Sequence, residues 1–199
     1  MTDILNLIPD PQFQRVDWTA HDATATQVTA QYALNVTNTN GGADSFAEYI
    51  LPDVSEYRGV DMTFACSLTI IQGNATECGN GLIFAHENNR TWNVTNGGTA
   101  TVGRKVLQFT LPNDVTGFAI RLYAPATNGS TFQWWRPILT RTEDYQRLLA
   151  GTGIGNPMDY FDGDTRPESV TPKPAGELGA ITIDPQRKPI IRVHDIINI

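Results

Sequence analysis

Apolar and polar residues alternate along several stretches of the chain, which is the pattern of a strand with one buried and one exposed face. In residues 60–70, apolar side chains occupy every second position, and most of the intervening residues are polar. The same period of two predicts one strand over residues 24–36 and further strands over 104–111 and 118–123. Shorter strands are expected over residues 4–8, 13–18, 46–51, 81–86 and 132–140.

Turn-forming residues separate these stretches, for example at Asn40–Gly42, Asn96–Gly98 and Pro112–Asp114. About nine strands with such connections are typical of an antiparallel sandwich or barrel. We therefore predict an all-β protein. Its fold would be an antiparallel jelly-roll β-sandwich over residues 1–141, followed by a short helix and an extended C-terminal arm.

The pattern changes after residue 141. Residues 142–150 predict a short helix, with Thr142 as its N-cap and Gly151 as its stop. The residues that follow are rich in glycine and proline, so the helix and a linker together are expected to occupy residues 142–175. The remaining residues, 176–199, are predicted to form an extended docking arm.

The arm is rich in branched apolar residues, whereas a disordered tail is normally polar. We therefore expect it to pack on a surface. The arm could fold back on its own sandwich as a last strand, or it could add to the sheet edge of a neighbouring subunit. The sequence favours neither alternative. The candidate docking residues are Ile181, Ile183, Ile190, Ile191, Val193, Ile196 and Ile197.

Composition and charge argue against two classes of partner. The chain has 14 Lys and Arg residues against 21 Asp and Glu residues, which gives a net charge of −7. Because phosphate binding needs clustered basic residues, we expect no nucleic-acid partner. No stretch approaches the ~20 apolar residues of a membrane span, so membrane insertion is not expected. The first residues lack a secretion signal, which predicts synthesis in a cytoplasm.

The sequence contains no recognisable catalytic motif. The histidines lie in no nucleophile–base arrangement, and no phosphate-cradling glycine loop precedes a helix. We therefore expect no enzymatic activity and no cofactor. Asp159, Asp162 and Asp164 gather in a Gly-containing stretch and are weak candidates for calcium. A plain turn in which the Asp side chains bind backbone amides is the favoured interpretation, so no metal is expected.

The two cysteines, Cys66 and Cys78, are expected to be free thiols, although the sequence leaves their redox state open. They flank a predicted hairpin turn near residue 74, and in that register Cys66 pairs near His86. Cys78 then lies about eight residues away along the strand, which at ~3.3 Å per residue is beyond disulfide reach.

Aromatic side chains are the candidates for glycan binding, because their flat faces can stack on sugar rings. The candidates are Trp92, Tyr49, Tyr57 and Tyr123. Trp92 lies in a polar, loop-like stretch and is the best of them, although core packing is the default for any single aromatic residue. Trp134 and Trp135 are adjacent in one predicted strand, so their side chains should point to opposite faces.

Two parts of the chain resemble a known family. Residues 6–13 (NLIPDPQF), with Trp18 shortly after, are similar to the opening of carbohydrate-binding-module-like jelly rolls in the tail proteins of siphophages. Residues 135–140 (WRPILT), followed by residues 160–165 (YFDGDT), are similar to the end of those domains. The order of elements matches over roughly residues 4–167. The departures are Asp10, where Asn is commoner, and the residues from 168 onward, which have no counterpart.

The resemblance implies a virion structural protein without catalytic residues, namely a phage minor tail protein made in the host cytoplasm and located in the tail. Its jelly roll would attach to or decorate the particle, and its arm would dock on other virion proteins in a symmetric assembly of several copies. One alternative is a carbohydrate-binding module that recognises host-surface glycans. A second is a capsid-associated decoration protein, and a glycan-degrading enzyme ranks last.

Overall fold

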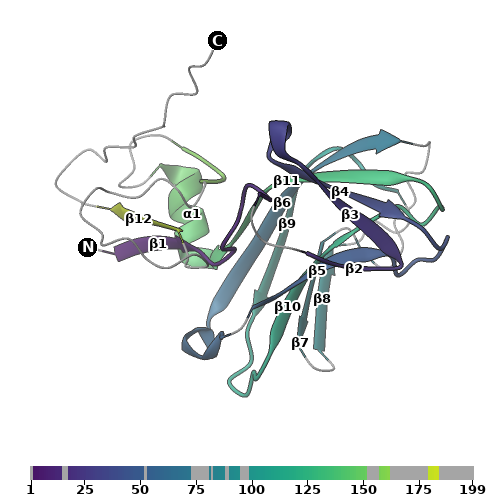
Figure 1. Cartoon of the computed structure of the whole chain (residues 1–199). Helices are drawn as coiled ribbons and strands as arrows, with labels where there is room; N and C mark the ends of the chain where they lie inside the picture. Colours follow the sequence, from purple (N-terminus) through teal and green to yellow (C-terminus); the bar gives the residue numbers. More distant parts are fainter. Residues whose placement is uncertain are drawn as a thin grey trace, which may run out of the picture.

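Two five-stranded antiparallel sheets pack face to face in the computed structural model of the chain, with a helix and a two-stranded ribbon at one end (Figure 1). The structure describes residues 2–14, 18–51, 53–72, 81, 83–87, 90–94, 99–151, 157–161 and 179–183. The β5 sheet consists, in spatial order, of β2 (Thr19–His21), β5 (Phe46–Leu51), β10 (Phe118–Tyr123), β7 (Ile83–Glu87) and β8 (Arg90–Val94). The β6 sheet consists of β3 (Ala23–Val28), β4 (Ala33–Asn38), β11 (Thr131–Arg141), β6 (Asp61–Gln72) and β9 (Gly103–Thr110).

The main core lies between the two sheets and is built from alternate, inward-facing positions of their strands. Met62, Phe64 and Leu68 of β6 are buried in it, as are Phe118 and Ile120 of β10. Such alternation, with apolar side chains inward, is what a two-layer sandwich requires of each strand. The predicted antiparallel β-sandwich with one short helix is therefore confirmed.

The region over residues 24–36 is a hairpin rather than the single strand that its alternation predicts. β3 and β4 are joined by the 3-10 turn η1 (Thr29–Gln31) and by Tyr32, whose φ of 50° is left-handed. The chain reverses there, and Val28 pairs with Ala33. Because the alternation continues on both sides of the turn, a period of two could not reveal it.

Two further expectations about strands are wrong. Phe13 and Trp18 belong to no strand, although both side chains are buried in the main core. β7 forms no hairpin with β6, because β6 pairs with β9 and β11 while β7 pairs with β10 and β8 in the other sheet.

The environment of the Cys66 thiol follows from this pairing. Cys66 lies opposite Lys105 of β9 rather than near His86. It is a buried free thiol whose Sγ lies 3.3 Å from the carbonyl oxygen of Trp135, and burial raises its pKa to about 12. The thiol is therefore protonated and unreactive at neutral pH. Cys78 lies outside the described residues.

The helix α1 (Thr142–Ala150) has the predicted bounds, and Gly151 ends it in a left-handed conformation with a φ of 68°. The predicted cap is wrong: the N-cap position belongs to Arg141, and the Thr142 hydroxyl instead lies 3.0 Å from the Thr63 hydroxyl. The helix covers one end of the β6 sheet through a second core of Ile4, Ala65, Ile138, Tyr145, Leu148 and Phe161. No helix among the described residues is long and apolar enough to span a membrane.

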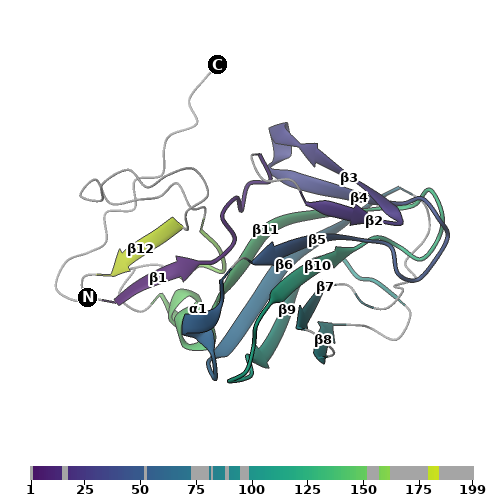
Figure 2. The ribbon, with the colours of Figure 1, turned by 60° about the horizontal axis from the view of Figure 1, so that its bottom comes forward.

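The ribbon joins the two ends of the chain. β12 (Gly179–Ile183) pairs antiparallel with β1 (Thr2–Asn6), so that Ile4 lies opposite Ile181. Figure 2 shows this ribbon beside α1 and apart from the two sheets. The first part of the arm, including Ile181 and Ile183, thus pairs within its own chain. Its other docking candidates lie outside the described residues, namely Ile190, Ile191, Val193, Ile196 and Ile197.

Candidate functional site

The outer face of the β5 sheet gathers five polar and aromatic side chains from three neighbouring strands. We call this set the outer cluster, and its members are His21, Phe46, Glu48, Arg121 and Tyr123. They lie on this face because the alternate residues of β5 and β10, such as Ala47 and Ile120, face the main core.

Strand register brings the cluster together from distant parts of the sequence. β5 lies between β2 and β10, so Phe46 lies opposite His21 on one side and Tyr123 on the other. In the next outward-facing row, Glu48 lies opposite Arg121. Directly opposed side chains of an antiparallel pair are close enough to interact, and both rows do so.

Arg121 and Glu48 form a fixed ion pair at the surface. Nε of Arg121 donates to Oε2 of Glu48 at 2.6 Å, and the guanidinium lies 4.3 Å above the centre of the Phe46 ring. Burial acts to lower the pKa of Arg121, but the hydrogen bond and charge of Glu48 outweigh it and raise that pKa. Nε2 of His21 lies 3.6 Å from the other Glu48 oxygen. The His21 side chain is 46% exposed, against 19% for Arg121 and 11% for Glu48.

The Phe46 ring lies beneath the guanidinium of this ion pair, and the Tyr123 ring packs beside Phe46. The Phe46 and Tyr123 rings are 5.2 Å apart, and both residues are buried. The Tyr123 hydroxyl lies 3.4 Å from Oδ1 of Asp44, and burial raises the pKa of Tyr123 to about 12. The phenol therefore keeps its proton at neutral pH, and its O–H can donate a hydrogen bond to the Asp44 carboxylate.

A buried asparagine fixes the loops beside the cluster. The amide nitrogen of Asn38 donates to the carbonyl oxygens of Gly42 and Pro125, and its amide oxygen accepts the N–H groups of Asn40 and Gly41. Four hydrogen bonds from one side chain tie the turn after β4 to the segment after β10. The Tyr123 end of the cluster is thus held in place before any ligand arrives.

The outer cluster suits an uncharged ligand with hydroxyl groups. The opposite charges of Arg121 and Glu48 compensate each other, so neither an anion nor a cation is favoured over the other. Ile50, two residues beyond Glu48 on the same face, is 63% exposed and offers an apolar surface. Within the described residues, no group of three or more His, Cys, Asp or Glu side chains could hold a metal ion.

Of the four aromatic residues predicted to bind glycan, only Tyr123 belongs to the outer cluster. The Tyr49 ring lies 5.8 Å from Trp18 and packs against the main core. Trp92 lies in a strand, β8, rather than a loop, and its ring stacks on Phe109 at 5.2 Å. Tyr57, at the end of the 3-10 turn η2 (Ser55–Tyr57), is buried in the main core.

Sequence reasoning did not find the other members of the cluster. The available signal was Arg121, the only charged residue in the otherwise apolar strand over residues 118–123. A lone charge in such a strand indicates either an exposed face or a buried partner. Its partner, Glu48, lies in another strand, and only the register of β5 and β10 identifies it.

Asp159, one of the weak calcium candidates, is engaged by two arginines. Its Oδ1 lies 2.6 Å from Nη2 of Arg136, and its carbonyl oxygen accepts a hydrogen bond from Nη2 of Arg104 at 2.7 Å. The next residue, Tyr160, donates its hydroxyl to the carbonyl oxygen of Pro11 at 3.1 Å. These contacts fasten residues 157–161 to the sandwich. The other two candidates, Asp162 and Asp164, lie outside the described residues.

No family model and no curated protein matches the chain. Among solved structures, the chain is similar to the CBM22-1 xylan-binding domain from Paenibacillus barcinonensis Xyn10C, with 10% sequence identity and a TM-score of 0.49 over 70% of this chain and 92% of that one. It is also similar to the second N-terminal cellulose-binding domain of Cellulomonas fimi β-1,4-glucanase C, with 13% identity and a TM-score of 0.44 over 69% and 95% of the two chains. A mutant family 29 carbohydrate-binding module in complex with mannohexaose gives 11% identity and a TM-score of 0.42 over 70% and 90%. The assignment of this chain to the β-sandwiches rests on its own sheet pairing and core.

Proposed function

We propose that the protein is a non-catalytic glycan-binding module that holds a saccharide on the outer cluster of the β5 sheet. The observation that carries this proposal is the Arg121–Glu48 pair, which is fixed at 2.6 Å over a buried aromatic base. It is partly exposed and lies between the imidazole of His21 and the apolar side chain of Ile50.

The chemistry of the pair matches that of a sugar. Each sugar hydroxyl is both a donor and an acceptor, while a guanidinium offers five donors and a carboxylate offers only acceptors. Hydrogen bonds to charged groups are stronger than those between neutral groups. Because strand register and the ring of Phe46 already fix the pair, little conformational entropy is lost when a ligand binds.

Hydrolysis of the bound glycan is not part of this proposal. Glycosidases use two carboxyl groups placed on either side of the scissile bond. The outer cluster contains one, Glu48, whose Oε2 is held by Arg121 and whose Oε1 lies 3.6 Å from Nε2 of His21. The cluster therefore suits recognition rather than acid–base catalysis.

Replacing Arg121 with glutamine is expected to weaken glycan binding about tenfold or more, because a charged donor is lost and Glu48 is left unpaired. Glu48→Gln should have a similar effect. Binding is measured by titration calorimetry with a ligand identified on a broad glycan array. The matched control is Arg90→Gln, which breaks another arginine–acid pair, Arg90 with Asp114 at 2.7 Å, on the edge strand β8. Wild-type affinity in both cluster variants, or an array without any ligand, would contradict the proposal.

We also propose that this module works in a virion, as a phage minor tail protein synthesised in the host cytoplasm. The motifs at the two ends of the sandwich that resemble siphophage tail proteins support this proposal, because they contact each other. Asn6 in the first motif bonds to Pro137 in the closing strand, and Tyr160 in the last motif bonds to Pro11. In this proposal, the part of the arm beyond β12 docks on neighbouring virion proteins in a symmetric assembly.

Antibody labelling of particles that carry the protein is expected to mark the tail, seen by negative-stain electron microscopy. Deleting residues 184–199, which keeps β12 paired with β1, should abolish incorporation into particles while the sandwich stays folded by circular dichroism, because this part of the arm would supply the contact with neighbouring subunits. Label on the capsid would favour a decoration protein instead. Incorporation of the truncated protein at the normal level would rule out the docking role of the arm.

A further inference from the structure

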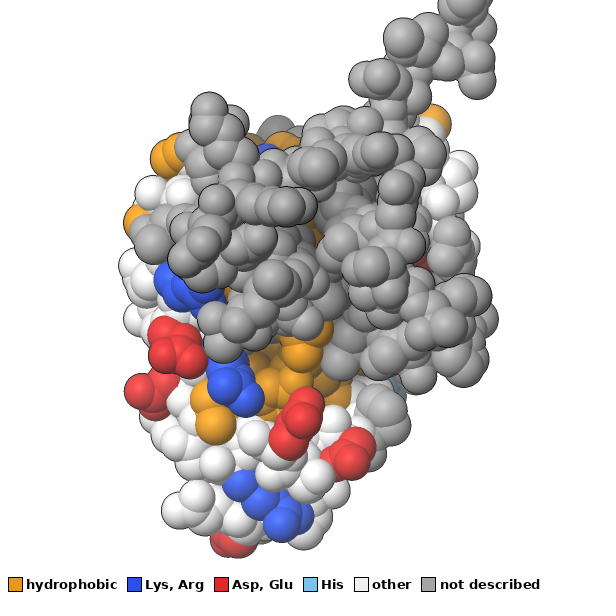
Figure 3. Space-filling model, turned by 90° about the vertical axis from the view of Figure 1, so that its left-hand side faces the viewer, with side chains coloured by type: hydrophobic (Ala, Val, Ile, Leu, Met, Phe, Trp, Pro, Cys, Tyr) orange, Lys and Arg blue, Asp and Glu red, His pale blue; other side chains and the backbone are white. Residues whose placement is uncertain are grey.

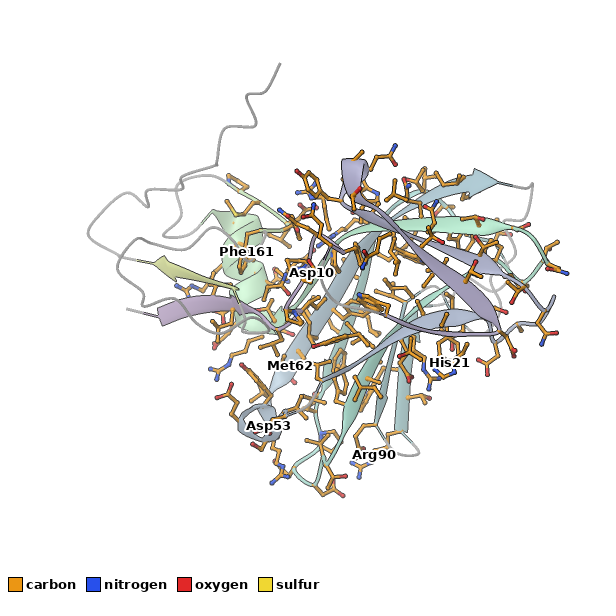
Figure 4. All side chains as sticks on the ribbon, in the orientation of Figure 1. Asp10, His21, Asp53, Met62, Arg90 and Phe161 are labelled. Atoms are coloured by element: carbon orange, nitrogen blue, oxygen red, sulfur yellow. The ribbon has the colours of Figure 1, made fainter. Side chains whose placement is uncertain are left out.

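A pocket of about 310 Å³ lies where the end of β1, the turn η2, the end of β11 and the start of α1 meet. Its lining residues are Leu5, Leu7, Glu56, Tyr57, Thr140, Arg141, Glu143, Asp144 and Arg147. Figure 3 faces the end of the molecule that carries α1 and the ribbon, and its uncovered apolar side chains are framed by acidic and basic ones. None of its lining residues belongs to the outer cluster, so the pocket is a separate place. In Figure 4, Phe161, which packs with α1, and His21 of the outer cluster lie on opposite sides of the molecule.

The Thr140 hydroxyl in this pocket is buried without a partner. Thr140 is 1% exposed, and within the part of the chain that the structure describes, its Oγ1 makes no hydrogen bond. The hydroxyl of Thr63, which lies opposite Thr140 on β6, lies 3.0 Å from the Thr142 hydroxyl instead. Buried polar groups in native proteins are nearly always satisfied, so an exception that lines a pocket points to a ligand.

The walls of the pocket combine apolar and aromatic surface. Leu7 is buried, and Tyr57 is buried at the end of η2. The guanidinium of Arg141 lies 5.8 Å from the centre of the Tyr57 ring. A ring-shaped ligand could therefore place its C–H face against Leu5, Leu7 or Tyr57 while its polar edge meets Thr140.

The charges around the pocket nearly balance. Three acids and two arginines line it, which leaves a formal charge of −1. One of each is already paired, because Nη1 of Arg147 donates to Oδ1 of Asp144 at 2.9 Å. Glu56 is engaged by the neighbouring Tyr57, so Arg141 and Glu143 offer a donor and an acceptor together. This lining disfavours a highly charged ligand of either sign and suits a neutral one with several hydroxyl groups.

We propose that this pocket binds one neutral sugar ring, such as the end of a glycan chain whose other residues lie elsewhere. Its volume is at the lower end of the ~300–1,000 Å³ that ligand pockets occupy, which fits a single ring and not an oligosaccharide. The choice of ligand class rests on the proposed glycan-binding function, whereas the location does not. The protein would then have two separate saccharide sites, an open one on the β5 sheet and an enclosed one beside α1.

The test is a titration of the ¹⁵N-labelled full chain with glucose, galactose, mannose and N-acetylglucosamine, followed by amide chemical shifts. At least one monosaccharide should shift the signals of residues 140–147 and leave those of β2, β5 and β10 in place. Thr140→Val, which removes the hydroxyl and keeps the shape, should weaken that binding about 3- to 10-fold. Its melting temperature should equal or exceed that of the wild type, because the unpartnered hydroxyl is gone. The control is Thr26→Val on the exposed face of β3, which should change neither binding nor the pocket signals.

The outcomes separate this inference from the proposed function. Shifts confined to the outer cluster, no shift with any of the four sugars, or wild-type affinity in Thr140→Val would overturn the pocket and leave the β5-sheet site standing on its own test. Shifts at the pocket in a protein whose outer cluster responds to no oligosaccharide would support the pocket and refute the site on the β5 sheet.

Discussion

Replacing Trp134 with alanine is expected to lower the free energy of unfolding by about 3–5 kcal/mol. Trp134 is completely buried between the sheets, and its ring meets the Phe132 ring edge-on at 6.2 Å. Its Nε1 donates to the carbonyl oxygen of Tyr123 at 2.8 Å. The substitution would leave a large cavity and an unpaired backbone acceptor, and tightly packed cores relax only partly around such gaps.

The loss would be measured by urea unfolding followed by circular dichroism. The matched control is the adjacent Trp135→Ala, because Trp135 lies on the opposite face of β11, is only partly buried and has an indole nitrogen without a partner among the described residues. Its truncation should cost less, about 1–2 kcal/mol. Equal losses at the two positions would mean that the core does not depend on which face each tryptophan occupies. Because Trp134 bonds to Tyr123, Trp134→Ala should also weaken binding at the outer cluster.

The strands that carry the outer cluster could be predicted, but the cluster could not. The sequence predicts strands over residues 46–51 and 118–123, and these ranges are the bounds of β5 and β10. Both faces of β5 carry large apolar residues, for example Phe46 on one face and Leu51 on the other, so alternation alone does not say which face is outside. That choice depends on which face packs against the opposite sheet, and no local pattern encodes such long-range contacts.

The interpretation of Trp92 as a loop residue fails for a related reason. Its neighbours are polar, as in a loop, but β8 is an edge strand in which Arg90 and Thr91 are exposed while Trp92 packs against the core. A five-residue strand with only two apolar residues, Trp92 and Val94, is too short to give a clear periodic signal. The helix over residues 142–150 and its stop at Gly151 were predictable, because helix termination depends on local backbone chemistry.

The opening NLIP motif has a structural role that could not be predicted from the sequence alone. β4 begins at Ala33, opposite Trp135, and the register of β11 against β6 shifts between Trp135 and Ile138. Beyond that shift, the edge of β11 is completed by residues 6–8 instead of a regular strand. The N–H of Leu7 donates to the carbonyl oxygen of Leu139 at 2.8 Å. The side chain of Asn6 makes the remaining contacts.

Replacing Asn6 with alanine is expected to cost about 3 kcal/mol or more, because its fully buried side chain satisfies three backbone groups. Its Nδ2 donates to the carbonyl oxygen of Pro137 at 3.1 Å, and its Oδ1 accepts the N–H groups of Ile8 at 3.2 Å and Leu139 at 3.1 Å. Alanine would leave all three groups buried and unpaired. The expected readout is a lower urea midpoint together with faster amide hydrogen exchange in β1.

Asn6→Asp tests the donor role of the Asn6 side chain separately from its acceptor role. Aspartate keeps an acceptor for the N–H groups of Ile8 and Leu139, but it cannot donate to Pro137 and it introduces a buried charge. It should therefore also destabilise the protein, and less so at a pH low enough to protonate the carboxyl group, which then regains a donor. Asn40→Ala is the control, because Asn40 is exposed and its replacement should change stability by less than about 0.5 kcal/mol. If Asn6→Ala were as stable as Asn40→Ala, the NLIP opening would not anchor β1 to the sandwich.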